Sequence, residues 1–234
     1  MVIFLKLVVA GNMPREIREF LFKRGFELYF TRENPFVLKG LGFHPDMQAC
    51  RVENKIICTP QMYDSYLDLA SSSDFEVICG KTELRSNYPH DIAYNIKIVG
   101  NRVFHNFNYT DCELKEAIDG KKKIDVHQGY SGCSVCAISD NAIITSDILI
   151  HKKACLDGMN SLLINDGCIL LEGFDHGFIG GASFSCDGRV FFFGDIRLHP
   201  DFERIEEFCS SMCVEIVCMD NFPLSDYGGA IVLN

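Results

Sequence analysis

One stretch, "GGASFSCDGRVFFFGDIRLHPDFERIEEFCSSMCVEIVCMD" (180–220), constrains the fold of this chain more than any other. Two apolar segments flank Asp187-Gly188, a pair that is typical of a tight hairpin turn. Pro200 suits the first position of a helix, and apolar residues follow it at a spacing of three to four. The apolar segment "VEIVC" comes next. The stretch therefore predicts a β-hairpin, a helix and a closing strand, in that order.

The same order of elements recurs in three segments upstream. They are "CRVENKIICTPQMYDSYLDLASSSDFEVIC", "AYNIKIVGNRVFHNFNYTDCELKEAIDGKKKIDVH" and "GCSVCAISDNAIITSDILIHKKACLDGMNSLLIND". Their predicted turns are Glu53-Asn54, Gly100-Asn101 and Asp140-Asn141. In the second segment Thr110 and Glu113 have the spacing of a capping box, which predicts that Thr110 caps the helix.

A fifth copy is divided between the two ends of the sequence. "GGAIVLN" supplies one strand, and "VIFLKLVVAGN", "PREIREFLFKRG" and "FELYF" supply a strand, a helix and a strand. Pairing of these terminal strands would close the array and leave no exposed sheet edge. The α/β chain is therefore predicted to be one domain, a five-bladed propeller of ββαβ units with a period of roughly 40–50 residues. The units are 225–234 plus 1–31, 43–80, 89–128, 129–166 and 176–220. An α/β sandwich with the same order of elements is the alternative.

Composition narrows the location and the partners of the chain. The 32 acidic and 22 basic residues give a formal net charge of −10, which opposes nucleic-acid binding and favours a cationic ligand. The apolar run at the start is too short to span a bilayer and has no basic segment before it, so we interpret it as a strand. Most of the twelve cysteines lie in apolar strands, which predicts reduced thiols in a cytoplasmic protein.

Five ββαβ units joined through the terminal strands resemble the pentein, or guanidino-group-modifying, superfamily. The segments "QGYSGCSV", "GFIGGASF" and "LSDYGGAIVL" are similar to a clostridial branch of that superfamily. The superfamily includes arginine and agmatine deiminases, dimethylarginine hydrolases, amidinotransferases and a non-catalytic ribosome anti-association factor. The resemblance implies a ligand site on the pseudo-fivefold axis, where each unit presents the residues that lead into its first strand.

Polar residues recur in these five lead-in segments. The segments are "FHPDMQAC", "YPHDIAYN", "VHQGYSGC", "DHGFIGGA" and "LSDYGGAI". Carboxylates there could pair with a guanidinium through two hydrogen bonds, and a histidine could transfer protons near neutral pH. We therefore expect a small cationic or guanidino-type ligand in an axial channel. The predicted ligand-binding residues are Asp46, His90, Asp91, Asp175, His176 and Asp226. Each of them alone is also typical of a turn or a helix cap.

This sequence differs from the enzymes of the superfamily at the position of the nucleophilic cysteine. Its hydrolases and deiminases place a nucleophilic cysteine near the end of the chain in a pattern like GGxHC. Here Gly228 and Gly229 match, and Val232 stands at the cysteine position. Cys133, with His127 close in sequence, is the alternative nucleophile and base for a C–N hydrolase or deiminase.

Two further possibilities follow from the same departure. A protein without the nucleophile could be a non-catalytic macromolecule-binding module like the ribosome anti-association factor, although the acidic charge opposes RNA. A zinc site built on Cys133 and Cys136 has no convincing fourth ligand, so no metal and no cofactor are expected.

Overall fold

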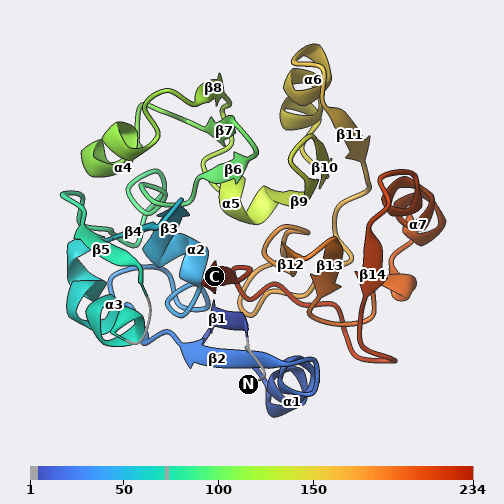
Figure 1. Cartoon of the computed structure of the whole chain (residues 1–234), viewed down its shortest axis with the longest axis horizontal. Helices are drawn as coiled ribbons and strands as arrows, with labels where there is room; N and C mark the ends of the chain where they lie inside the picture. Colours follow the sequence, from blue (N-terminus) through green and yellow to red (C-terminus); the bar gives the residue numbers. More distant parts are fainter. Residues whose placement is uncertain (1–4, 72–73, 234) are drawn as a thin grey trace.

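The computed structural model describes residues 5–71 and 74–233. Residues 1–4, 72–73 and 234, which the predicted units include, lie outside the described residues. The fold is mixed α/β, with five small three-stranded sheets arranged around a common centre (Figure 1). This arrangement brings segments from all parts of the sequence to the middle of the molecule.

Four of the sheets repeat one pattern. A hairpin pairs two antiparallel strands, and a helix then carries the chain to a third strand that pairs in parallel with the second. The strands are β3 (Ala49–Val52), β4 (Lys55–Cys58), β5 (Glu76–Cys79), β6 (Lys97–Val99), β7 (Arg102–His105), β8 (Lys122–Asp125), β9 (Val135–Ser139), β10 (Ala142–Thr145), β11 (Asn160–Leu163), β12 (Ser183–Cys186), β13 (Arg189–Phe192) and β14 (Glu215–Val217). The connecting helices are α3 (Tyr63–Ala70), α4 (Cys112–Ala117), α6 (Ile148–Leu156) and α7 (Phe202–Ser211).

The fifth sheet joins strands from the two ends of the sequence. β15 (Ile231–Leu233) pairs antiparallel with β1 (Leu5–Val9), with Lys6 opposite Leu233. β1 also pairs in parallel with β2 (Phe26–Phe30), and α1 (Arg15–Phe22) connects them. The predicted pairing of the terminal strands is therefore confirmed.

Local sequence signals placed the turns correctly and one cap incorrectly. The four predicted hairpin turns all connect the paired strands, and Asp187 in one of them adopts a left-handed φ of 51°. The predicted cap of α4 (Thr110) is wrong by one residue. Asp111 caps the helix, because its side chain accepts a hydrogen bond from the Glu113 amide. Thr110 is instead bonded to the ring of His105.

The core consists of five apolar clusters, each built from two neighbouring sheets. For example, Leu7 and Phe26 of the β1 sheet pack with Phe184 and Phe191 of the β12 sheet. The other clusters join the β1 and β3 sheets, the β3 and β6 sheets, the β6 and β9 sheets, and the β9 and β12 sheets. Burial of these side chains fixes each sheet against its two neighbours, because apolar surface is removed from water on both sides.

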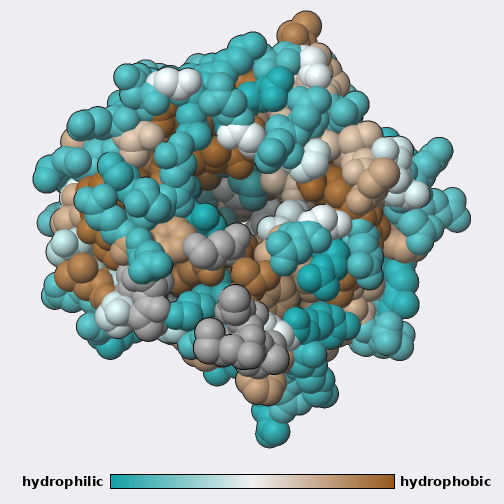
Figure 2. Space-filling view, viewed as in Figure 1, coloured by the Kyte–Doolittle hydropathy of each residue, from teal (hydrophilic) through white to brown (hydrophobic). Residues whose placement is uncertain are grey.

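Two very short helices lead into first strands near the centre. α2 (Pro45–Gln48) precedes β3, and α5 (Ser131–Ser134) precedes β9. The space-filling view shows a hollow near the middle of the face, with both hydrophilic and hydrophobic residues around it (Figure 2). Within residues 5–71 and 74–233, no helix is both long enough and apolar enough to cross a membrane.

Candidate functional site

Four titratable side chains from different parts of the sequence meet near the centre. His44 and Asp46 come from the start of α2, Cys133 lies in α5, and Asp226 lies in the loop before β15. Suitable atoms of His44, Asp46 and Cys133 all lie within 4.8 Å of one another. We call these four residues the axial cluster.

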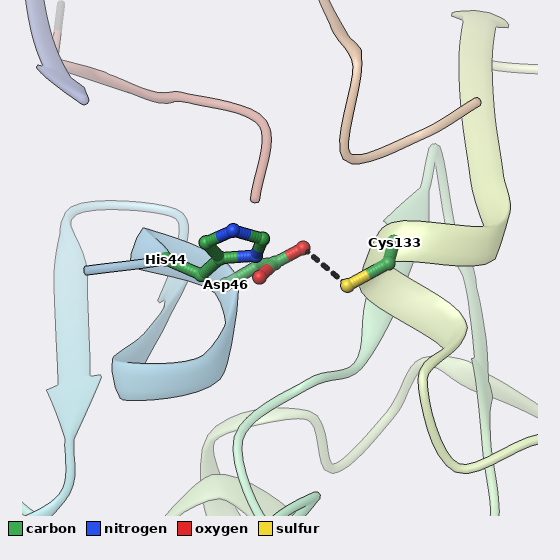
Figure 3. A group of neighbouring side chains, drawn as sticks. All are labelled: His44, Asp46 and Cys133. Carbon is green, nitrogen blue, oxygen red and sulfur yellow. Dashed lines mark hydrogen bonds between the residues drawn. The ribbon is translucent and has the colours of Figure 1, made fainter. Parts of the chain in front are cut away.

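The thiol of Cys133 lies directly against a carboxylate. Its Sγ is 2.9 Å from Asp46 Oδ2, so the thiol donates to the carboxylate, as the dashed line in Figure 3 marks. Asn95 Nδ2 donates to the same Sγ at 3.2 Å. Asn95 is itself held, because its Oδ1 accepts from the backbone amides of Gly132 and Cys133 at 2.7 and 3.3 Å. The sulfur is therefore fixed between an acceptor and a donor.

The second pair in the cluster is His44 and Asp226, with 3.8 Å between His44 Nδ1 and Asp226 Oδ1. The Asp226 carboxylate accepts from the backbone amides of Gly228 and Phe178, both at 2.9 Å. In contrast, His44 Nδ1 and Asp46 Oδ1 are buried without a hydrogen-bond partner. Such unsatisfied buried atoms are uncommon in folded proteins and often mark functional sites.

Glycines allow the backbone to pack closely around the cluster. A Cβ on Gly181 would lie 2.0 Å from Asp226 Oδ1, and a Cβ on Gly228 would lie 2.5 Å from the His44 Cβ. Gly228 also has a φ of +71°, which other residues rarely adopt. The Gly-rich lead-in segments therefore bring Asp226 and His44 into contact.

Burial controls the protonation of the cluster. It raises the pKa of Asp46 to about 6, although the hydrogen bond from Cys133 lowers this pKa. It also raises the pKa of Asp226 to about 6, although the charge interaction with His44 lowers that pKa. Burial lowers the pKa of His44 and raises that of the Cys133 thiol well above its usual value, with the two carboxylates adding to the latter shift. At neutral pH we therefore expect neutral His44, a thiol at Cys133 and ionised carboxylates at Asp46 and Asp226, with the Lys97 cation near Asp46.

Three cavities approach the cluster. One, of about 500 Å³, is lined in part by His44 and Asp226. The other two differ in size and share no lining residue. The smaller, of about 260 Å³, is lined by Leu41, Tyr130, Cys133, Leu171, Phe174, Asp175, His176, Phe178 and Asp226. The larger, of about 710 Å³, includes Asp46 and Gly132 together with the first strands and hairpin turns of several sheets. The bonded pair of Asp46 and Cys133 therefore lies between the larger and the smaller cavity.

The structure brings most, but not all, of the predicted site residues together. Asp46, Cys133 and Asp226 belong to the axial cluster, and Asp175 and His176 line the smaller cavity. Asp91 is buried and accepts a 2.6 Å hydrogen bond from Tyr130, which also lines that cavity.

His90 and His127 lie elsewhere. Both are exposed, and neither lines the smaller cavity. Among the described residues, the Cys133 thiol bonds Asp46 and Asn95, so His127 is not the partner that the sequence predicts. The histidine of the cluster is His44, which shares a lead-in segment with Asp46.

Several residues that shape the site were not among the predicted site residues. Asn95 orients the thiol from the lead-in to β6, and Tyr130 and Phe178 form aromatic walls. Val232, at the usual cysteine position, lies in β15 and lines the larger cavity instead of the smaller one. Amide and aromatic side chains are common beside strands, so the sequence does not distinguish these three residues. Only the folded structure shows that Asn95 contacts the thiol and that Tyr130 and Phe178 line the cavity.

Comparisons with known proteins give a family and a fold. A family model described as "Family of unknown function (DUF6873)" matches residues 8–231. No curated protein matches.

Solved structures of guanidino-modifying enzymes share the fold at low identity. DDAH from Pseudomonas aeruginosa, complexed with citrulline, has 8% identity and a TM-score of 0.59 over 93% of this chain and 92% of that chain. Agmatine deiminase from C. jejuni, with substrate bound, has 12% identity and a TM-score of 0.57 over 98% and 92%. An amidinotransferase from Microseira wollei has 9% identity and a TM-score of 0.51 over 96% and 90%. The predicted resemblance to the pentein fold is confirmed.

Proposed function

This chain belongs to the family described as "Family of unknown function (DUF6873)", and we propose that it binds a small guanidino- or amidine-type cation in the smaller cavity. The observation that carries the proposal is the buried carboxylate of Asp226, which lines this cavity together with the carboxylate of Asp175, while no lysine or arginine among the described residues lines it. A bound cation would stabilise their ionised forms, because burial alone disfavours negative charge.

The walls of the cavity suit a planar cation. Tyr130, Phe174 and Phe178 present aromatic surface, and a guanidinium can stack on such rings. Asp175 and Asp226 supply carboxylates that can accept paired hydrogen bonds. The volume of about 260 Å³ suits a small molecule. The fold adds support, since solved structures of this fold include agmatine deiminase with its substrate.

Ligand-dependent thermal stability tests this proposal. We expect agmatine or guanidine, in buffer with a chelator, to raise the melting temperature, and putrescine, which lacks the planar group, to raise it less. Asp226→Asn should abolish the shift because it removes the buried charge. Asp140→Asn, which changes an exposed carboxylate outside the smaller cavity, should keep the shift. The absence of a shift with every guanidino and amidine compound, or its survival in Asp226→Asn, would contradict the proposal.

A second candidate is a cysteine-dependent C–N hydrolase or deiminase, and the contact between Cys133 and Asp46 favours it. In this reaction the thiol proton passes to Asp46 at 2.9 Å and Sγ forms a bond to the amidine carbon. The C–N bond then breaks, and Asp46 returns the proton to the leaving amine. Water then replaces the sulfur and restores the thiol. The raised thiol pKa opposes the first step, and a bound cation would lower it.

Product formation and selective alkylation test the catalytic candidate. A hydrolase should release amine or ammonia from a guanidino compound, and Cys133→Ser should stop the release. Iodoacetamide labelling mapped by mass spectrometry should show ligand-protected reaction at Cys133. Binding without release of amine, together with an unreactive Cys133, would leave a binding protein.

We also propose that the five sheets form a closed ring of the five predicted units, and that the protein works in the cytoplasm. The five apolar clusters, which pair the sheets in cyclic order, support the ring. All twelve cysteines are unpaired, which supports a reducing compartment. Circular permutation at the Asp140-Asn141 turn tests the ring, because a closed array should keep its melting temperature within a few degrees.

A further inference from the structure

We propose that the axial cluster is a binding site for a thiophilic divalent transition-metal ion such as Zn²⁺, held by His44, Asp46, Cys133 and Asp226. This inference goes beyond the proposed function, because it concerns a different ligand and stands on the donor atoms of the cluster alone. The donor atoms lie close together, two of them are buried without a hydrogen-bond partner, and hydrogen bonds orient the other two.

The separations between the donor atoms of His44, Asp46 and Cys133 suit one small ion, and Asp226 approaches the histidine of that group. A tetrahedral ion with bonds of about 2.0–2.3 Å holds its ligand atoms roughly 3.3–3.8 Å apart. The donors of His44, Asp46 and Cys133 lie within 4.8 Å of one another, and His44 Nδ1 is 3.8 Å from Asp226 Oδ1. Small rotations of these side chains would therefore complete the coordination. Figure 3 shows His44, Asp46 and Cys133 grouped together, with Asp46 directed toward the sulfur.

Two of the donor atoms have no other partner. His44 is only 1% exposed, and its Nδ1 is buried without a hydrogen bond. Asp46 Oδ1 is likewise buried and unbonded. A buried polar atom without a partner destabilises the fold, and a metal ion would satisfy both atoms at once.

The remaining two donors are oriented from behind by hydrogen bonds. Asn95 donates to Cys133 Sγ, which would stabilise a thiolate, and backbone amides of Phe178 and Gly228 hold the Asp226 carboxylate. Outer contacts of this kind are typical of metal sites. Binding would release the Cys133 proton to solvent and form a sulfur–metal bond.

The types of donor decide which ion is favoured. Thiolate and imidazole prefer Zn²⁺ and similar ions, whereas Mg²⁺ and Ca²⁺ prefer oxygen ligands alone. Cys133 and Asp226 also line the smaller cavity, so a metal and the proposed guanidino cation would compete for them. Metal binding must therefore be measured without an organic ligand.

Cobalt substitution in the full chain tests this inference directly. The chelator-treated protein is titrated with Co²⁺, and we expect one equivalent to produce visible d–d bands and a near-ultraviolet thiolate-to-cobalt band. Cys133→Ser should lose the thiolate band. His44→Ala and Asp46→Asn should each weaken Zn²⁺ binding by at least about tenfold in competition with a chromophoric chelator.

Cys155→Ser is the matched control. Cys155 also lies near a histidine, at 3.9 Å from His151 Nε2, but it is exposed. Its helix, α6, lies at the outside of the molecule, away from α2 and α5 (Figure 1). This variant should keep the full signal. Circular dichroism confirms folding, and Asp46→Asn, which preserves side-chain shape, provides the test if His44→Ala does not fold.

The outcomes are decisive for the metal site alone. A missing thiolate band in the parent protein, an unchanged band in Cys133→Ser, or loss of the band in Cys155→Ser would overturn the inference. Since the thermal-shift test is made with a chelator present, failure of metal binding would not affect the proposed guanidino ligand, and failure of the guanidino ligand would not affect the cobalt result.

Discussion

Asp111 and Asp46 begin helices in neighbouring units, yet their carboxylates have opposite surroundings. Asp111 accepts from the backbone amides of Lys81, Thr82 and Glu113 at 2.8, 2.7 and 2.9 Å. Asp46 accepts from the Cys133 thiol, and its other oxygen has no partner. The first carboxylate connects loops and stabilises the fold, whereas the second is held in place by the fold.

The pKa values of the two aspartates reflect this difference. Burial alone would raise the pKa of Asp111, but hydrogen bonds from Thr82, Lys81 and Glu113 outweigh it and lower the pKa. At Asp46 burial dominates and raises the pKa to about 6. A lowered pKa means that the ionised group stabilises the folded protein, and a raised pKa means that it destabilises it. Burial of an aspartate therefore does not by itself distinguish a structural role from a functional one.

The largest effect is expected from removing the structural carboxylate. Asp111→Ala leaves three backbone amides without their acceptor and should lower the free energy of unfolding by about 3 kcal/mol. Urea denaturation at neutral pH measures the loss. Asp140→Ala, at an exposed carboxylate, should change stability by less than about 0.5 kcal/mol. A loss at Asp111 no larger than that of this control would mean that its carboxylate does not stabilise the fold.

Removal of the Asp46 charge should have the opposite effect on the free energy of unfolding. Asp46→Asn in chelator-treated protein removes a buried negative charge while it preserves shape, and should raise the free energy of unfolding by about 1–2 kcal/mol at pH 7.5. The same urea experiment measures it. If the substitution instead destabilises the protein by a similar amount, Asp46 has a structural role like that of Asp111.

The pH dependence of unfolding sharpens the contrast. The destabilisation by Asp46 is complete well above its folded pKa of about 6 and disappears as pH falls toward its ordinary value of 3.8. The difference in the free energy of unfolding between Asp46→Asn and the parent protein should therefore shrink by about 1 kcal/mol as the pH falls from 7.5 to 5. The stabilisation by Asp111 should persist through that range and disappear only below its unfolded value of 3.8. Parallel curves for the parent and Asp46→Asn would refute the raised pKa.

The part of the fold that could be predicted depended on local signals. Two-residue turns such as Asp187-Gly188 and the order of apolar segments predicted the five sheets, because hairpin geometry is encoded within a few residues. The terminal strands could be paired because their pairing completes a fifth copy of the repeat and leaves no exposed sheet edge. The one-residue error at the α4 cap arose because Thr110 and Asp111 are both good caps, and only the positions of Lys81 and Thr82 favour Asp111.

The site was predicted only as a set of lead-in segments. Those segments gave Asp46, Cys133 and Asp226, because the fold brings the start of each first strand toward the centre. They could not give the distances between side chains from different units, so His127, near Cys133 in sequence, was chosen over His44. Asn95 was missed because its hydrogen bond to Cys133 spans 38 residues.

The smallest expected effect tests the coupling within the cluster. Burial is the main reason that the pKa of the Cys133 thiol is raised, and the charge of Asp46 is the next largest reason. Asp46→Asn should therefore lower the thiol pKa and speed alkylation of Cys133 by a few-fold at pH 8, since only the thiolate reacts. Exposed Cys155 serves as the internal standard in the same digest and should react much faster than Cys133 in both proteins. Because burial remains when the charge is removed, the acceleration should stay modest. An unchanged rate of Cys133 alkylation would mean that burial alone suppresses the thiolate, and that the charge of Asp46 does not affect the thiol pKa.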